Sequence, residues 1–272
     1  MKKNILITGS TDGIGLQTTK MLLEQGHHVL LHGRNAEKLA AVKKTLSDVA
    51  DAENIESYVA DLSQLADVEK LAKAITEKHS KLDVLINNAG VFKTPNAITQ
   101  DGLDVRFVVN TIAPYLLTQK LLPLMDDTGR VINLSSAAQS PVNIDALTGR
   151  VRLSDMDAYS QSKLAITMWS RSLALTLNDK GPEEKVPVII AVNPGSLLAT
   201  KMVKEGFGMA GKDITIGADI LIHLSLDDEF VSASGKYFDN DSGRFASPHQ
   251  DALDSKKSAA IVSEIETILA DN

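Results

Sequence analysis

A tyrosine and a lysine four residues apart form the pair in this sequence that is best suited to proton transfer. Tyr159 and Lys163 stand in a segment, residues 158–163, that we expect to be helical. Positions i and i+4 lie on one face of a helix, one turn apart. A phenol has an ordinary pKa of about 10, and a fixed ammonium group nearby lowers this pKa because it favours the phenolate. Such a tyrosine can give a proton to a carbonyl oxygen or take one from an alcohol.

A second polar group lies in a long helical stretch at residues 103–122, where Asn110 is followed by Pro114. Because proline has no N–H, the usual hydrogen bond from residue 114 back to the Asn110 carbonyl cannot form. We therefore expect this helix to kink and to leave the Asn110 carbonyl free to hold a water molecule.

The first fifteen residues have the order of strand, glycine-rich turn and helix that suits a phosphate-binding site. The apolar run Ile5–Ile7 ends at Gly9, and helix-forming residues continue to Gln25. Glycines let backbone N–H groups approach a pyrophosphate, and the helix N-terminus adds the positive end of a dipole. The spacing differs from the usual G-x-G-x-x-G fingerprint, so an ordinary turn remains the alternative. The residues that would line the site are Gly9, Ser10, Thr11, Asp12, Gly13, Ile14 and Gly15.

Strands alternate with helical stretches through the first two hundred residues, which is typical of an α/β fold with a parallel, doubly wound sheet and helices on both faces. No linker rich in proline, glycine or serine divides the chain. We predict one domain over residues 1–245 and a C-terminal helical extension over residues 246–272 that packs on it. The expected strands lie near residues 3–8, 28–32, 55–60, 82–87, 129–135, 187–193 and 235–239.

The glycine loop, the tetrapeptide at residues 87–90 (Asn-Asn-Ala-Gly) and the Tyr159–Lys163 pair resemble, in this order, the short-chain dehydrogenase/reductase family. Alone, the Tyr–Lys spacing arises by accident in many helices, but the combination does not. The resemblance implies a Rossmann-type sheet of about seven strands in the order 3-2-1-4-5-6-7. It is nearest to the retinol-dehydrogenase-like and carbonyl-reductase branch, whose members have a similar terminal helix and a similar insertion between Ser136 and Tyr159.

The resemblance also implies the roles of the site residues. Ser136 would orient the substrate oxygen, Lys163 would tune Tyr159 and bind the nicotinamide ribose, and Asn110 would support a water relay. Serines and asparagines at strand ends are also ordinary turn residues. The catalytic set would be Asn110, Ser136, Tyr159 and Lys163, and the further cofactor contacts would be Asp61, Leu62, Asn88, Ala89, Gly90, Pro194 and Gly195.

Two of the positions that the resemblance concerns have a local alternative or differ from the family pattern. Asp61 or Ser63 has an equally simple role as the N-cap of the helix that follows. After Gly195, the threonine that the family places four residues later is Ala199 here, and Thr200 follows it. Thr200 therefore lies one residue beyond the position that contacts the cofactor in the family.

Arg34 favours NADP(H) over NAD(H) as the cofactor. In a dinucleotide-binding fold, a carboxylate about 20 residues past the glycines binds the ribose 2′-OH of NAD. Here Gly33 occupies that position and Arg34 follows it. An arginine can form a bidentate pair with a 2′-phosphate, which a carboxylate would repel. The alternative is a surface arginine in the turn that enters a helix.

Two segments are expected at the rim of the site. Residues 143–157 are polar and predict a loop. Residues 197–214 contain Met202, Met209 and several glycines, which suits a substrate lid. A short amphipathic helix packed on the rim is the simpler alternative for the second segment.

The composition of the chain limits the kinds of partner that we expect it to bind. The chain has 272 residues, a net charge of −7 and no cysteine. The acidic balance argues against nucleic acid and anionic membranes as partners, and no run is long enough for a membrane anchor. The lack of cysteine excludes disulfides and fits a reducing compartment, so we expect a cytoplasmic protein. The histidines show no H-E-x-x-H or H-x-x-H spacing, which predicts no metal site.

These observations predict an NADP(H)-dependent oxidoreductase that acts on a small-molecule carbonyl or alcohol. Relatives pair through the two long helices, here at residues 103–122 and 158–178, so we expect a dimer or tetramer. One rival is a non-catalytic NADP-sensing protein on the same fold, which the intact Tyr159–Lys163 pair disfavours. Another is an epimerase or dehydratase of the extended branch of the family, which chain length and glycine spacing disfavour.

Overall fold

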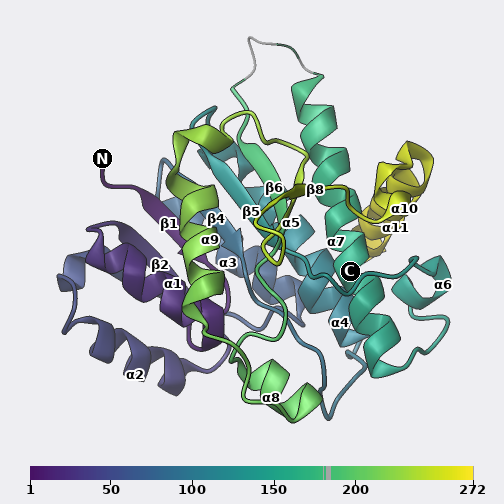
Figure 1. The fold of residues 1–272 in the computed structure, drawn as a ribbon, viewed down its shortest axis with the longest axis horizontal. Helices are drawn as coiled ribbons and strands as arrows, with labels where there is room; N and C mark the ends of the chain where they lie inside the picture. Colours follow the sequence, from purple (N-terminus) through teal and green to yellow (C-terminus); the bar gives the residue numbers. More distant parts are fainter. Residues whose placement is uncertain (180, 182–184, 272) are drawn as a thin grey trace.

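Seven parallel strands and one antiparallel edge strand form the sheet at the centre of the molecule (Figure 1). The structure is a computed structural model that describes residues 1–179, 181 and 185–271. The strand order is β3-β2-β1-β4-β5-β6-β7-β8. The strands are β1 Asn4–Ile7, β2 His28–Gly33, β3 Ile55–Val59, β4 Val84–Asn87, β5 Arg130–Leu134, β6 Val188–Asn193, β7 Tyr237–Asp239 and β8 Arg244–Ala246.

The predicted fold class and strand order are confirmed, and every expected strand agrees with the observed one to within two residues. The eighth strand was not predicted. It has three residues and pairs antiparallel with β7. Its central residue, Phe245, lies edge-on to Phe238 with the ring centroids 5.2 Å apart and to Phe230 at 5.9 Å. So short a strand depends on these aromatic contacts, which sequence periodicity does not reveal.

Helices cover both faces of the sheet and create two separate cores. The helices α1, α2 and α9 pack on one face through residues such as Leu22, Leu39 and Leu221. The helices α3, α5 and α7 pack on the other face, where Trp169 is completely buried. The main helices are α1 Gly13–Glu24, α2 Ala36–Leu46, α3 Leu65–Lys78, α5 Ala113–Leu121, α7 Asp155–Asn178, α9 Thr215–Leu226 and α11 Ser255–Asp271. Shorter helices are α4 Val105–Phe107, α6 Ile144–Leu147, α8 Lys201–Phe207 and α10 Gln250–Leu253.

The long helix expected at residues 103–122 is broken, as the proline predicted, but not by a simple kink. A π-helical turn, Val108–Ile112, separates α4 from α5 and contains Asn110. Pro114 is the second residue of α5, where the missing N–H is tolerated because first-turn donors have no partner inside the helix. Single π turns of this kind often occur at functional sites. The free carbonyl of Asn110 stays a prediction.

The C-terminal helix α11 packs on the outside of α7, at the right of Figure 1. Ile261 and Ile265 of α11 are buried in the core that surrounds Trp169. Tyr115 of α5 lies edge-on to Trp169, with centroids 5.5 Å apart, and its hydroxyl donates to Glu266 of α11 at 2.7 Å. The last residue of the predicted extension, residue 272, lies outside the described part of the chain, and the division into a domain and an extension stays a prediction.

The segment predicted as a polar loop at residues 143–157 is more ordered than expected. It contains α6, where Ala146 and Leu147 are fully buried. Its last residues already belong to α7, which begins at Asp155. Buried apolar residues in a short polar segment explain the difference, because they attach the segment to the core.

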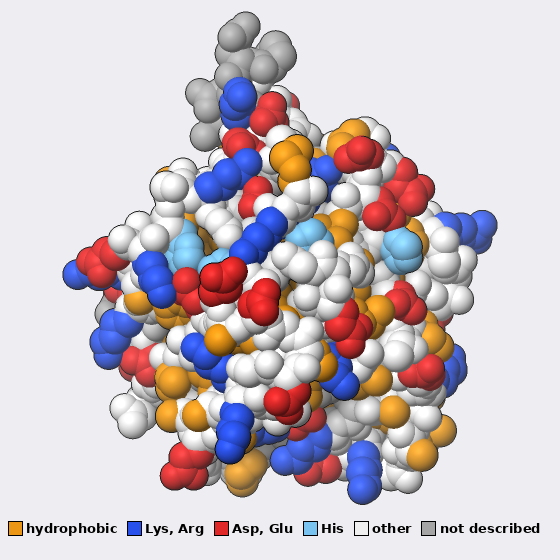
Figure 2. Space-filling model, turned by 90° about the vertical axis from the view of Figure 1, so that its left-hand side faces the viewer, with side chains coloured by type: hydrophobic (Ala, Val, Ile, Leu, Met, Phe, Trp, Pro, Cys, Tyr) orange, Lys and Arg blue, Asp and Glu red, His pale blue; other side chains and the backbone are white. Residues whose placement is uncertain are grey.

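Charged side chains of both signs lie intermingled on the side of the molecule drawn in Figure 2. Among the described residues, no helix is both long enough and apolar enough to cross a membrane. In the same part of the chain, no group of three or more histidine, aspartate and glutamate side chains is arranged to hold a metal ion.

We expect α11 to be part of the cooperative fold. Ile265→Ala should lower the free energy of unfolding by about 2–5 kcal/mol, because it removes a fully buried side chain and leaves a cavity. Urea denaturation followed by circular dichroism measures the loss. Thr267→Ala, on the exposed side of α11, is the control and should change stability by less than about 0.5 kcal/mol. Equal small losses for both variants would mean that α11 is not part of the cooperative unit.

Candidate active site

The start of α7 positions the proposed proton donor. Ser154 is the N-cap of this helix, and its hydroxyl accepts the Asp157 N–H at 3.2 Å. Tyr159 follows in the first turns and is partly exposed, whereas Lys163, one turn later, is only 4% exposed. The Lys163 Nζ lies 5.7 Å from the centre of the Tyr159 ring. The structure therefore places the two side chains on one helix face, as their spacing predicts.

Lys163 is a buried cation with one strong acceptor. Its Nζ donates to the Leu134 carbonyl, at the end of β5, at 2.7 Å. A Cβ atom built on Gly90 would lie 3.5 Å from the same Nζ, so the ammonium lies beside the end of the β4 strand segment. Burial lowers the pKa of Lys163 to about 8. Its charge is thus held at the carboxyl edge of the sheet at some cost in solvation.

The two serines after β5 have different partners. Ser135 is buried, and its hydroxyl donates to the Lys163 carbonyl at 2.9 Å and shares a hydrogen bond with Thr167 at 2.7 Å. Ser136 is partly exposed, and its side chain forms a hydrogen bond with Tyr159. The Tyr237 hydroxyl donates to the Ser136 carbonyl at 3.1 Å. Ser135 therefore supports α7, while Ser136 has its hydroxyl beside the phenol.

The pKa of Tyr159 differs from the sequence prediction. Burial is the largest influence and raises this pKa above its ordinary value, and the hydrogen bond with Ser136 only partly opposes the rise. The expected lowering by Lys163 is therefore not met in this geometry. The sequence could show that an ammonium was near, but not how much of the partly exposed tyrosine is packed against other side chains.

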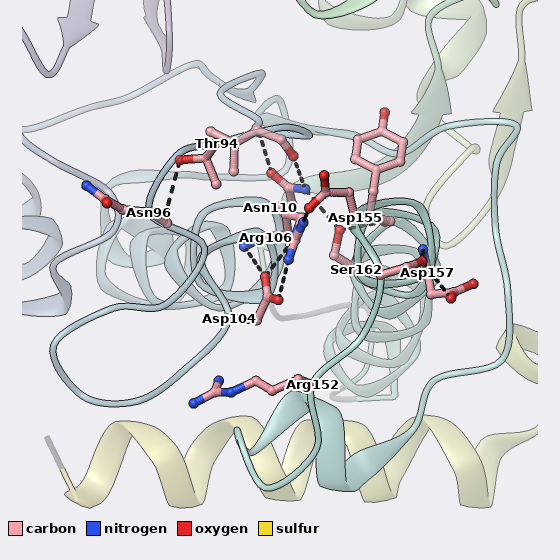
Figure 3. A network of polar contacts seen from close by, with 12 residues as sticks. Thr94, Asn96, Asp104, Arg106, Asn110, Arg152, Asp155, Asp157 and Ser162 are labelled. Atoms are coloured by element: carbon pink, nitrogen blue, oxygen red, sulfur yellow. Dashed lines mark hydrogen bonds and ion pairs between the residues drawn. The ribbon is translucent and has the colours of Figure 1, made fainter. Parts of the chain in front are cut away.

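Asn110 connects two parts of the site (Figure 3). Its Oδ1 accepts the Val91 N–H at 2.8 Å, and its Nδ2 donates to the Val91 carbonyl at 3.0 Å. The same Nδ2 donates to Ser162 Oγ at 2.9 Å, and Ser162 Oγ donates to the Tyr159 carbonyl at 2.7 Å. The Asn110 side chain thus binds the chain after β4 and the helix that carries Tyr159.

Arg106 lies one turn before Asn110 and joins α4 to the start of α7 (Figure 3). This arginine is 1% exposed and donates to both carboxylate oxygens of Asp104, at 2.8 and 2.6 Å. It also pairs with Asp155, the first residue of α7. The two carboxylates raise the pKa of Arg106, with the hydrogen bonds to Asp104 as the main cause. Sequence reasoning did not identify this pair, because its members lie 49 residues apart.

Asn88 and Asn87 join the end of β4 to neighbouring strands. Asn88 Nδ2 donates to the Thr8 carbonyl at 2.8 Å and to the Gly9 carbonyl at 3.2 Å. Asn87 Nδ2 donates to Asn133 of β5 at 2.7 Å. A Cβ on Gly15 would lie 2.4 Å from Asn88 Nδ2, so only glycine fits there. This close approach brings the backbone of the glycine loop to the edge of the sheet.

His32 supports the glycine loop from β2, a role that the sequence did not reveal. Its Nδ1 accepts the Gly9 N–H at 3.1 Å, and its Nε2 lies 3.0 Å from the Ala60 carbonyl. These partners require a neutral ring that carries its proton on Nε2. Burial lowers the pKa of His32 to about 4. Ser10 is also fully buried, and its hydroxyl bonds to the His32 backbone, so this hydroxyl braces the loop.

A hollow of about 470 Å³ lies between the glycine loop, the end of β2 and the start of α8. Asp12, the N-cap of α1, accepts the Gly13 N–H at 2.8 Å and pairs with Lys38 at 2.6 Å, beside this hollow. The Lys38 pair is the main cause that lowers the pKa of Asp12. The lining residues are Thr11, Arg34, Asn35, Glu37, Lys38 and Lys201. Arg34 was predicted here; Lys38 and Lys201 were missed, although Arg34 and Lys38 have an i, i+4 spacing.

Asp61 and Leu62 follow β3. The Asp61 carboxylate accepts hydrogen bonds from a nearby turn residue, whereas the Leu62 side chain points into the core. Asp61 Oδ1 accepts from the N–H and the hydroxyl of Ser63, at 2.9 and 2.8 Å. The N-cap of α3 is Gln64, so the alternative in which Asp61 or Ser63 caps this helix is wrong. Leu62 is 5% exposed and its side chain belongs to the core. The capping prediction failed because the chain turns once more before the helix begins.

The turn after β6 is braced by residues that follow β7. Asn240 Nδ2 donates to the Pro194 carbonyl at 2.9 Å, and Asp241 accepts the Ser196 N–H at 2.9 Å. Gly195 has a φ of +127°, and Leu197 is unusual for a leucine with a φ of +57°. Such strain persists only where surrounding contacts fix the backbone, and it is frequent at ligand-binding sites.

The predicted lid at residues 197–214 contains α8. Thr200 is the N-cap of α8, and its hydroxyl accepts the Val203 N–H at 3.2 Å. A Cβ on Gly13 would lie 3.6 Å from the Thr200 methyl group, so Thr200 lies beside the glycine loop despite its shifted position in the sequence. Phe92, which sequence reasoning missed, lies edge-on to Tyr159 with the ring centroids 5.2 Å apart.

Comparisons with known proteins agree with this geometry. A family model described as short chain dehydrogenase matches residues 3–209. Human retinol dehydrogenase 13 is 30% identical over 256 residues, which cover 87% of this chain and 76% of the relative. Human polyprenol dehydrogenase is 30% identical over 254 residues, with coverage of 87% and 76%. Among solved structures, the Pseudomonas aeruginosa RhlG/NADP complex has a TM-score of 0.69 and 25% identity, covering 87% of this chain and 94% of that one.

The buried His32 should make stability depend on pH. Its folded-state pKa of about 4 lies below the ordinary value of 6.5, so its full contribution is present above pH 6.5 and is lost as the pH falls towards 4. Between pH 7.5 and pH 5, we expect wild type to lose about 2 kcal/mol more stability than His32→Asn. This variant keeps an acceptor for the Gly9 N–H but does not titrate. Urea denaturation of both proteins at each pH measures the difference, and parallel losses would contradict the argument.

Proposed function

This chain belongs to the short-chain dehydrogenase family, and we propose that it is an NADP(H)-dependent oxidoreductase that moves a hydride between a nicotinamide and a carbonyl or alcohol substrate. One observation carries the proposal. Tyr159, Ser136 and Lys163 meet at the carboxyl end of β5, where open α/β sheets bind their ligands.

The residues at this edge fit a dinucleotide with a 2′-phosphate. NADP(H), when bound, supplies or accepts the hydride. The glycine loop offers backbone N–H groups, and Gly15 has no room for a Cβ atom. Arg34 and Lys38 line the neighbouring hollow and would bind the 2′-phosphate, since charge-assisted hydrogen bonds to phosphate are strong. Asn88, Ala89, Gly90, Pro194 and Gly195 would border the rest of the cofactor. The RhlG structure is an NADP complex, which supports the same cofactor here.

Tyr159 would handle the proton of the reaction. Because burial raises its pKa, the phenol stays protonated at neutral pH and is ready to give a proton to a carbonyl oxygen. Ser136 would orient that oxygen, and Lys163 would favour the phenolate that remains after proton transfer. Asn110 would support a water relay through its main-chain carbonyl, because its side chain is already occupied by Val91 and Ser162.

An apolar substrate suits this site best. The Phe92 ring lies edge-on to Tyr159 and would form an apolar wall beside the reacting oxygen. Met202 and Met209 belong to the segment that contains α8 and add flexible apolar groups. Two relatives bear the names retinol dehydrogenase and polyprenol dehydrogenase. We therefore include long-chain or cyclic apolar aldehydes, ketones and alcohols in the proposal.

The same residues bear on the rival functions and on the assembly of subunits. A non-catalytic cofactor sensor would not need Tyr159 and Lys163 together, and an extended-branch epimerase or dehydratase would be expected to match other relatives. A cytoplasmic dimer or tetramer remains part of the proposal. Because α11 lies on α7 and bonds to Tyr115 of α5, subunits that pair through these helices must use the surface that α11 leaves free.

Tyr159→Phe should lower kcat by about a thousandfold, within the range for loss of a general acid. The dissociation constant for NADPH should stay within about twofold, because ring packing against Phe92 is kept. Tyr58→Phe is the matched control: it removes a hydroxyl bonded to Glu56 on the edge strand β3 and should keep full turnover. Loss of NADPH absorbance with a panel of apolar aldehydes and ketones is the measurement. Retained turnover in Tyr159→Phe would refute the assignment.

Wild type should use NADPH in preference to NADH, and Arg34→Ser should remove much of this preference. We expect kcat/KM for NADPH to fall about tenfold or more with loss of a charged hydrogen-bond donor, while the value for NADH changes little. Arg244→Ser, at an exposed position of β8, is the control. A wild-type preference for NADH would contradict the role of Arg34 and leave the role of Tyr159 untouched.

A further inference from the structure

The helix α8 touches two parts of the site that are far apart in the sequence. At its first residue, Lys201 lines the same hollow as Arg34 and Lys38. Near its last residue, Gly206 packs on Phe92: a Cβ built on this glycine would lie 2.7 Å from the ring. In Figure 1, α8 lies by itself at the lower edge of the molecule, outside the helical layers on the sheet.

Lys201 is available for a new partner. Its side chain is 71% exposed and faces Glu205 at 3.6 Å, a surface pair one turn along the same helix. Such exposed pairs contribute little, so a phosphate can replace Glu205 at small cost. Lys38, by contrast, already pairs with Asp12 at 2.6 Å. Lys201 also helps to lower the pKa of Asp12, which places its charge close to the glycine loop.

On the basis of the proposed function, we propose that Lys201 of α8 is a specificity-determining residue for NADP(H) and binds the same 2′-phosphate as Arg34. Among the described residues that line the hollow, Arg34 and Lys201 are then the cations without a short ion pair, and Lys38 joins them at the phosphate if it leaves Asp12. An NAD(H) molecule offers Lys201 no phosphate at this position. Selection of the cofactor is therefore shared between the sheet edge and the lid segment.

Because α8 also contacts Phe92, a bond between Lys201 and the 2′-phosphate would affect the region beside Tyr159 where the substrate would bind. Gly206 rests on Phe92, Lys93 Nζ donates to the Gly206 carbonyl at 3.4 Å, and Phe92 lies against Tyr159. A phosphate that attracts Lys201 therefore also favours the position of α8 in which its far end covers the ring beside Tyr159. NADP(H) should stabilise this closed position more than NAD(H) does.

The test compares Lys201→Met with Lys204→Met, a variant that removes an exposed cation one turn away on α8. Isothermal titration calorimetry with NADP⁺, NAD⁺ and adenosine 2′,5′-bisphosphate measures binding without turnover. We expect Lys201→Met to weaken NADP⁺ and the bisphosphate about tenfold, as for one charged hydrogen bond, and to leave NAD⁺ within about twofold. Lys204→Met should change none of the three by more than about twofold.

A second readout follows the lid. Trypsin cleavage after Lys212, in the segment that contains α8, should be slowed by adenosine 2′,5′-bisphosphate in wild type and Lys204→Met, but not in Lys201→Met. Equal weakening of NADP⁺ and NAD⁺ by Lys201→Met, or an equal effect of Lys204→Met, would overturn the role of Lys201. If wild type itself binds NAD⁺ as tightly as NADP⁺, the proposed cofactor preference fails and the role of Lys201 fails with it. If wild type prefers NADP⁺ and Lys201→Met keeps that preference, only the role of Lys201 fails.

Discussion

The close approach of the glycine loop to the end of β4 is the constraint on which the rest of the site depends. Asn88 donates to the carbonyls of Thr8 and Gly9, and this contact leaves no space for a Cβ at residue 15. The Asn88 amide is half-buried and needs such partners, because an unpaired polar group away from water is costly. The position of the loop fixes the start of α1 and one wall of the hollow that contains Arg34. His32 braces the same loop from β2.

A second, separate set of buried polar contacts fixes the catalytic side. The Lys163 ammonium binds the Leu134 carbonyl, while Arg106 and Asn110 attach the broken helix to the start of α7. Each of these side chains has at least one hydrogen-bond partner, so the contacts fix the helix that carries Tyr159 relative to β5. The two sets meet at residues 88–91, since Asn88 belongs to the first and Val91 to the second. The tetrapeptide after β4 therefore joins the cofactor side to the catalytic side.

Features of the fold and the site that arise from local sequence patterns could be predicted, whereas those that arise from contacts between distant segments could not. The strands were predictable because their apolar runs are bounded by turn residues, and Tyr159 with Lys163 because helix periodicity alone places them together. His32, Phe92 and Lys201 were not, since their partners come from distant segments. Pro114 predicted a break in its helix, but the π-helical form depends on packing. Burial raises the pKa of Tyr159, which a sequence does not show, and the lowering expected from the ammonium together with a nicotinium charge stays a prediction.

Burial acts on both members of the catalytic pair, and in opposite directions. It raises the pKa of Tyr159, which is neutral when protonated, and lowers that of Lys163 to about 8, because a low-dielectric surrounding disfavours charge in either group. At pH 7 the phenol therefore keeps its proton while the ammonium keeps its charge. Once the phenol has given its proton away, the same low dielectric strengthens the attraction between phenolate and ammonium. Burial therefore disfavours the phenolate, and Lys163 offsets part of that cost as long as it stays positive.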